Sequence, residues 1–276
     1  MKTKDPLYIQ KDLPPVENHF FYYYACIAKV FSYIFFITGS VLLGVIVFPF
    51  LKLFSKDKLT FRKRARKFVS GTFKFYISFL SALHLVKFSV EGKEKLLNLK
   101  SKIIVANHPS LLDIVTIISL IPNADCIVRG GLGKSIMKGV INQLYIVNNL
   151  GTEEMIERSK QSLEEGNCLV IFPEGTRTPP NGIIPYKRGA ARIAIETKST
   201  IVPVFIGGGK KYGLGKYENF FSYNHKGIYN YSLYVLDEIN SKDFSDLENQ
   251  IAARRLTEKI HESISKSAFL HEGIVL

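Results

Sequence analysis

The stretch "ANHPSLLD", residues 106–113, places a histidine and an aspartate five residues apart, directly after an apolar run. On a straight helix these two side chains would point about 140° apart and would not meet. If His108 lies in the turn before a helix and Asp113 in its first turn, the carboxylate can bond one imidazole nitrogen and leave the other for a substrate. Such a pair is typical of a general base with an orienting acid. From this spacing alone, a helix-capping turn that happens to contain a histidine is an equally good interpretation.

A second polar group follows another apolar run, in "IFPEGTRTPPNG", residues 171–182. Glu174, Gly175 and Arg177 stand at the end of a predicted strand, where ligand sites gather in open α/β sheets. Gly175 lets the backbone approach a ligand, Arg177 can bind an oxyanion with two hydrogen bonds, and Lys187 adds positive charge downstream. The alternative is that Glu174 and Arg177 form a structural ion pair.

The elements that position these residues alternate between short β-branched runs and helical patterns. This alternation predicts an α/β fold with a mixed, largely parallel sheet flanked by helices, over a domain of residues 89–276. The strands are expected within 102–107, 125–130, 168–175, 200–208 and 230–239, and the helices within 113–121, 152–166, 189–199 and 245–269.

The N-terminal region, residues 1–88, differs in composition, with a long uncharged segment followed by a basic one, and is predicted to bind a membrane. Residues 30–51 carry no charge over 22 positions, which is long enough for a helix to cross a bilayer. We expect a basic linker over 52–67 and an interfacial helix over 68–88. A hairpin with both helices crossing would export the basic linker, against the positive-inside rule. A single crossing or a monotopic hairpin both put the rest of the chain on the cytosolic face of the inner membrane.

Charge and cysteine usage exclude other classes of function. The net charge of +13 is concentrated in residues 52–67, where eight Lys or Arg stand against one Asp, beside the most apolar segment. Anionic lipid explains this placement better than nucleic acid, which we do not expect as a partner. The three cysteines are scattered, and no histidine has metal-ligand spacing, so the sequence predicts a reducing compartment and no metal.

The motifs resemble those of the lysophospholipid acyltransferase superfamily, which includes 1-acylglycerol-3-phosphate acyltransferases. "NHPSLLD" matches the N-H-x4-D motif, "FPEGTR" matches the third motif and "IVPVFIG" the fourth, within residues 85–240. The resemblance implies transfer of an acyl group from acyl-CoA or acyl carrier protein to a lysolipid hydroxyl, without a further cofactor. It implies that His108 takes the hydroxyl proton and that Asp113 orients the imidazole. It also implies that the acceptor headgroup is bound by Glu174, Gly175, Thr176 and Arg177, with Lys187 in support.

One position departs from the family. Its second motif commonly ends in an arginine that binds the acceptor phosphate, whereas this chain has Asn148 and Asn149 in the matching region. Amides can bond a headgroup but cannot neutralise a phosphate. The missing charge could come from Arg129, Lys134 or Arg188, or the acceptor could be another hydroxylated lipid, as in bacterial aryl polyene pathways. A thioesterase or lysolipid hydrolase that uses the same pair, and a silent lipid-binding scaffold, are the alternatives from other functional classes.

Overall fold

A computed structural model describes residues 13–148, 151–178, 184–216, 218–274 and 276 of the 276-residue chain. An eight-stranded sheet forms the centre of the molecule, with strand order β1-β7-β6-β2-β5-β3-β4 and with β8 paired to β6. Strands β6, β2, β5, β3 and β4 run parallel, whereas β7 is antiparallel to β6 and β1 is parallel to β7. The strands are β1 Val86–Glu91, β2 Ile103–Ala106, β3 Ala124–Arg129, β4 Ile146–Asn148, β5 Cys168–Ile171, β6 Thr200–Gly207, β7 Tyr229–Val235 and β8 Ile239–Asn240. The predicted mixed, largely parallel sheet is confirmed.

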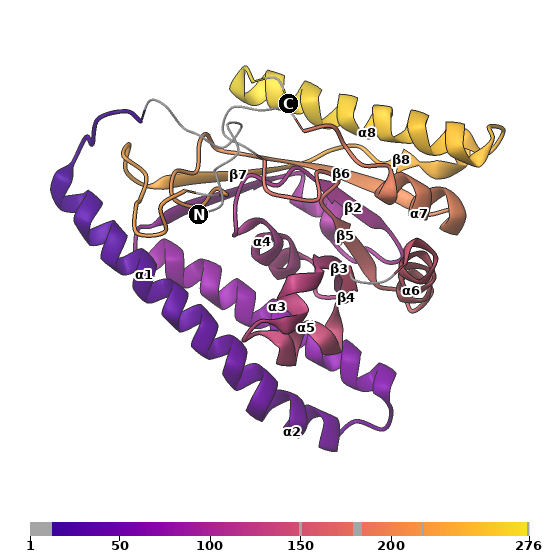
Figure 1. Cartoon of the computed structure of the whole chain (residues 1–276), viewed down its shortest axis with the longest axis horizontal. Coiled ribbons are helices and arrows are strands. Elements are labelled where there is room, and N and C mark those ends of the chain that lie inside the picture. Colours follow the sequence, from indigo (N-terminus) through magenta and orange to yellow (C-terminus); the bar gives the residue numbers. More distant parts are fainter. Residues whose placement is uncertain (1–12, 149–150, 179–183, 217, 275) are drawn as a thin grey trace.

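Helices cover both faces of this sheet (Figure 1). Helices α6, α7 and α8 contribute to the apolar core on one face, and α3, α4 and α5 to the core on the other. Every residue of β2 and β5 is buried, which explains why these strands are uniformly apolar rather than alternating. The bounds are α4 Asp113–Leu120, α5 Lys138–Leu144, α6 Thr152–Glu164, α7 Gly189–Thr197 and α8 Asn249–Glu272.

The N-terminal region forms a helical hairpin along the second of these faces. Its first arm is one continuous helix from His19 to Leu53, made of α1 His19–Leu42, a π-helical segment Leu43–Val47 and α2 Phe48–Leu53. Its second arm is α3, Lys58–Ala82. The predicted helix over 30–51 is therefore longer at its N-terminal end.

The prediction of a basic linker over residues 52–67 is wrong for most of its length, because α3 begins at Lys58. Asp57 caps this helix through the backbone N–H of Thr60, at 2.7 Å. Buried residues at helical spacing, Phe61, Ala65 and Val69, then hold it against the core. The predicted interfacial helix over 68–88 ends at Ala82 and is followed by β1, so the expected domain boundary at residue 88 falls inside a strand.

An ion pair between α3 and β3 holds the hairpin against the sheet. Arg66 donates to Asp125 at the start of β3 at 2.8 Å, and both side chains are buried. Asp125 also accepts a hydrogen bond from Ser162 of α6, at 2.7 Å. The hairpin and the strands share one apolar core, to which Ala25 and Phe48 of the first arm belong.

Candidate active site

His108 and Asp113 meet in the turn between β2 and α4, as the sequence predicts. His108 Nδ1 donates to Asp113 Oδ2 at 2.6 Å, with Asp113 as the first residue of α4. Asp113 is fully buried, and the His108 side chain is 20% exposed. Asn107 fixes the start of the turn, because its amide exchanges two hydrogen bonds with the backbone of Ile206 on β6, at 2.7 and 2.9 Å.

Three further donors hold the Asp113 carboxylate in place. The Ser110 backbone N–H donates to Oδ2 at 2.8 Å and the Ser110 hydroxyl to Oδ1 at 2.7 Å. The hydroxyl of Tyr231, on β7, also donates to Oδ1. These donors give the carboxylate a single orientation, which sets the orientation of the imidazole as well.

The imidazole ring of His108 lies on Phe172, with 4.1 Å between ring centroids and 17° between ring planes. This stacking and the bond to Asp113 leave Nε2 without a hydrogen-bond partner in the described part of the chain. With Nδ1 as the donor, Nε2 carries the lone pair. The arrangement can therefore accept a proton from a molecule that reaches the exposed edge of the ring.

Glu174 lies beside His108 because β5 neighbours β2 and both motifs follow the carboxyl ends of these strands. Its Oε1 accepts hydrogen bonds from the His108 backbone N–H at 3.1 Å and from the Thr178 hydroxyl at 2.9 Å. Thr178 in turn donates its backbone N–H to the His108 carbonyl at 2.7 Å. Glu174 is buried, and these contacts make it a group that positions the histidine turn. Its proposed contact with an acceptor headgroup remains a prediction.

Burying the Glu174 carboxyl group costs free energy, because one of its two oxygens lacks a hydrogen bond within the described chain. Its Oε2 has no hydrogen-bond partner among the residues that the structure describes. Burial raises the pKa of Glu174 to about 7, and the nearby charge of Asp113 adds to this, whereas the two hydrogen bonds and His108 oppose it. The group thus changes its charge close to neutral pH.

The turn after Glu174 brings Gly175 against Lys187. Gly175 has a φ of +68°, which favours glycine, and a Cβ there would lie 2.8 Å from Lys187 Nζ, so the lysine side chain lies directly over the turn. Lys187 is exposed and Thr176 half-buried. The predicted proximity of the lysine to this turn is therefore present in the structure.

Arg177 contacts a loop that follows β6. Its Nη1 donates to the carbonyls of Leu214 and Gly215, at 2.9 and 2.8 Å. Buried Lys29 of α1 donates to the carbonyls of Gly213, at 3.2 Å, and of Ser222 in the same loop. Arg177 thus helps to hold the segment 213–222, and its predicted contact with an oxyanion remains a prediction.

Of the two asparagines in the matching region, the structure describes Asn148 alone, and this residue lies far from His108. Asn148 ends β4, three strands from β2, which corresponds to about 14 Å across the sheet. Its register partner is Arg129, the last residue of β3, and both side chains are exposed. Asn149 falls outside the residues that the structure describes. Arg129, one of the three cations considered for the missing charge, is thus placed beside Asn148.

Sequence reasoning missed Tyr231 and Lys211. The Lys211 side chain is buried, donates to the carbonyls of Gly207 and Gly209 at 2.8 and 2.9 Å, and lies 5.0 Å above the Tyr231 ring. Burial lowers the pKa of Lys211 to about 8, although Asp113 and Glu272 oppose the shift. Neither residue belongs to a local motif. The alternation of apolar and polar residues along β7 is the one pattern that indicates that Tyr231 faces the core.

Two motifs at neighbouring strand ends, one with a His–Asp pair and one with a Glu-Gly-Thr-Arg turn, define the candidate site of this α/β protein. Residues 87–207 match the family model described as Acyltransferase. This match spans less than half of the chain, which resembles the superfamily of the 1-acyl-sn-glycerol-3-phosphate acyltransferases.

The chain is similar in sequence to curated relatives and similar in fold to a solved structure. The chain is 31% identical to the 1-acyl-sn-glycerol-3-phosphate acyltransferase of Cocos nucifera, over 44% of this chain and 41% of the relative. It is 28% identical to a chloroplastic enzyme of the same name from Arabidopsis thaliana, over 62% and 48%. It thus spans less than half of the length of these two relatives. The crystal structure of the acyltransferase PlsC from Thermotoga maritima has the same fold, with a TM-score of 0.67, 21% identity and coverage of 90% of this chain and 99% of that one.

Proposed function

We propose that this chain transfers a fatty acyl group from a thioester donor, acyl-CoA or acyl carrier protein, to the hydroxyl of a lysophospholipid such as 1-acylglycerol-3-phosphate. The observation that carries the proposal is the His108–Asp113 hydrogen bond of 2.6 Å, with the carboxylate buried and Nε2 left free of partners in the described chain. A fixed imidazole of this kind is a general base suited to neutral pH.

The mechanism follows from this geometry. Nε2 of His108 accepts the proton of the lysolipid hydroxyl as its oxygen attacks the thioester carbonyl carbon. Asp113 stabilises the imidazolium that forms. The tetrahedral intermediate then collapses, the carbon–sulfur bond breaks, and the imidazolium returns the proton to the thiolate, which leaves as a thiol. The products are the acylated lipid and the free thiol of the donor.

Arg129 is proposed to supply the positive charge that the asparagines lack. It stands in register with Asn148, at the carboxyl edge where the family resemblance implies a headgroup contact. A guanidinium can bind a phosphate with two hydrogen bonds, and the neighbouring amide can add a third. This placement keeps a lysolipid with a phosphomonoester as the favoured acceptor.

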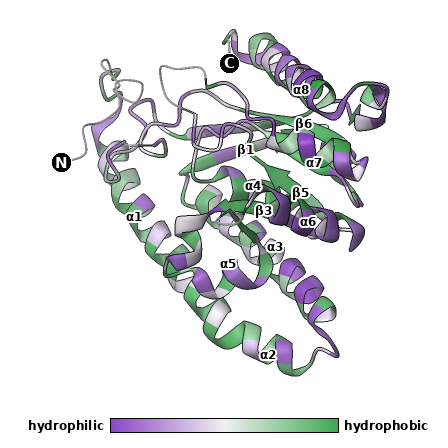
Figure 2. Ribbon diagram, turned by 45° about the vertical axis from the view of Figure 1, so that its right-hand side comes forward, coloured by the Kyte–Doolittle hydropathy of each residue, from purple (hydrophilic) through white to green (hydrophobic). Residues whose placement is uncertain are grey.

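The hairpin is proposed to lie in one leaflet of the membrane. The helix from His19 to Leu53 has a mean hydropathy of 2.5 in its most apolar window, and 11% of that window is buried. Hydrophobic residues follow most of α1 and α2 (Figure 2). Exposed large apolar residues on this arm include Phe20, Ile27, Phe31, Ile34, Val45, Ile46 and Phe50.

The packing of this arm favours monotopic binding over a single crossing. A Cβ on Gly44 would lie 3.3 Å from Gly139 Cα, so the π-helical segment of the arm touches the start of α5 in the globular part. Phe48 near its end is buried in the shared core. A helix that is held along its length by a water-exposed domain cannot cross the bilayer without unpacking. The basic residues of the hairpin fit the anionic cytosolic leaflet.

The test is to incubate the purified chain in neutral detergent with labelled acyl-CoA or acyl carrier protein and a panel of lysolipids and other hydroxylated lipids. An acylated lipid supports the proposal, free fatty acid indicates a hydrolase, and no reaction with any pair contradicts an enzymatic role. We expect His108→Ala to abolish transfer while the chain stays folded and vesicle-bound, and Asp113→Asn to cost less than the histidine change. Substantial turnover by His108→Ala would remove the histidine as the base.

A further inference from the structure

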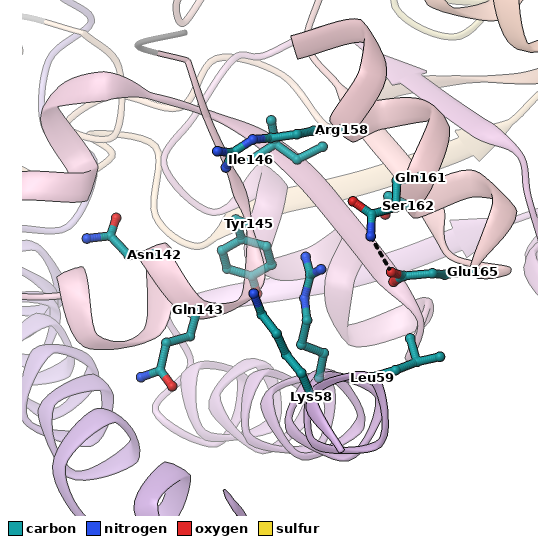
Figure 3. Close-up of a pocket in the computed structure, with 11 residues that line it drawn as sticks. Lys58, Leu59, Asn142, Gln143, Tyr145, Ile146, Arg158, Gln161, Ser162 and Glu165 are labelled. Atoms are coloured by element: carbon teal, nitrogen blue, oxygen red, sulfur yellow. Dashed lines mark hydrogen bonds between the residues drawn. The ribbon is translucent and has the colours of Figure 1, made fainter. Parts of the chain in front are cut away.

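A cavity apart from the candidate active site lies at the start of the outermost parallel strand, β4. It has a volume of about 460 Å³ and lies between the start of α3, the end of α5 and the second half of α6 (Figure 3). Tyr145 and Ile146, at the start of β4, line it, whereas Asn148 and Arg129 mark the opposite end of the strand. The proposed acyl transfer uses none of the residues that line this cavity. Its volume is within the range of small-ligand sites.

The charged residues that line the cavity are mostly basic. Lys58 and Arg62 come from α3 and Arg158 from α6, and Glu165 is the one carboxylate among the lining residues. The Glu165 carboxylate already accepts hydrogen bonds from the amides of Gln161 and Asn167, both at 3.3 Å. Figure 3 shows Lys58 and Arg158 entering from opposite sides of Tyr145. An anion inside would therefore meet cations from two elements.

Arg62 shows unused hydrogen-bonding capacity in this cavity. Its Nε is buried and has no hydrogen-bond partner within the described ranges. Its Nη2 lies 3.8 Å from the Asp125 carboxylate, which is already paired with Arg66 at 2.8 Å. Asp125 is therefore shared with a closer partner, and the Arg62 guanidinium, which lines the cavity, keeps positive charge that an oxyanion in the cavity would balance.

The surroundings of the cavity favour a phosphate carried by a lipid. Leu59, Tyr145 and Ile146 give the cavity an apolar wall beside the cations. Lys58 follows directly on the hairpin turn, where Leu53 and Phe54 are 78% and 61% exposed. We propose that this cavity binds a phosphate-bearing polar group, which the headgroup of an anionic phospholipid or free phosphate can supply.

The test measures binding to the full chain in neutral detergent by calorimetric titration, with two probes. One probe is inorganic phosphate, and the other is a short-chain phosphatidylglycerol, with phosphatidylcholine as the neutral-headgroup comparison. All proteins carry Arg129→Gln, so that the proposed headgroup contact at the other end of β4 does not contribute. The cavity variant adds Lys58→Gln and Arg158→Gln. The matched control adds Lys63→Gln and Lys160→Gln, which remove the same charge from exposed positions of α3 and α6 that do not line the cavity.

We expect the cavity variant to bind at least about tenfold more weakly than the control variant, because charge-assisted hydrogen bonds are lost. Binding of phosphatidylglycerol in preference to phosphate would identify the lipid as the source, and the reverse would identify the free anion. If neither probe binds, or if the control variant loses as much affinity as the cavity variant, the proposal is overturned.

Discussion

Replacing Glu174 with glutamine tests how burial acts on the group that positions His108. The change keeps an oxygen that can accept the hydrogen bonds of the His108 N–H and the Thr178 hydroxyl, and it removes the ionisable proton. The difference between wild type and the glutamine variant therefore reports the pH dependence that belongs to this carboxyl group alone.

The magnitude follows from the pKa of Glu174, which burial raises from 4.5 to about 7. Between these values the unfolded chain loses the proton while the folded chain keeps it, so the folded state binds more protons and stability falls as the pH rises. Above pH 7 both states are ionised and the loss is complete. With about 1.4 kcal/mol per pH unit, the change from pH 5 to pH 8 amounts to roughly 2.5 kcal/mol.

The assay is unfolding in neutral detergent at pH 5 and pH 8, followed by circular dichroism, since the chain has no tryptophan. We expect wild type to lose about 2.5 kcal/mol relative to Glu174→Gln on going from pH 5 to pH 8. Glu157→Gln, at an exposed position of α6, is the control and should track wild type at both pH values. A wild-type-to-glutamine difference that stays constant between the two pH values would refute the reasoning.

Three further changes have expected outcomes. Tyr231→Phe removes a donor to Asp113 and should lower kcat/KM about ten- to a hundredfold and shift the pH profile of transfer, whereas Tyr234→Phe, on the other face of β7, should do neither. Phe31→Glu with Ile34→Glu should weaken flotation with anionic vesicles at least about tenfold, and Phe269→Glu with Leu270→Glu, exposed on α8, should not. Asp125→Ala should lower the free energy of unfolding by about 3–5 kcal/mol, measured by denaturation, because Arg66 is left buried without its carboxylate. An unchanged result in any of these would contradict the role given to that residue.

The parts of the fold that the sequence predicted are those with strong local patterns. Central strands such as β2 and β5 are continuous apolar runs, and the motifs at their ends were placed correctly for that reason. The meeting of His108 with Asp113 follows from five residues of local chain. Strands β1, β4 and β8 have partly exposed or very short patterns and were not predicted.

The parts that were missed depend on contacts between distant segments. Residues 58–67 were interpreted as a linker because of their charge, although Phe61 and Ala65 already show helical spacing. Arg66 is buried in a way that only its partner on β3 makes possible. Tyr231 lies 118 residues from Asp113, and no local sequence pattern indicates that these two residues are in contact.

The loop 213–222 has a practical consequence for handling this protein. Lys29 of the first hairpin arm and Arg177 of the FPEGTR motif donate hydrogen bonds to carbonyls of the same loop. Deleting the first arm to obtain a detergent-free fragment would therefore remove the Lys29 hydrogen bonds to this loop and uncover the core around Phe61 and Val69. Solubilising changes belong instead on the outward positions of α1, where Phe31 and Ile34 can be exchanged while Lys29 stays in place.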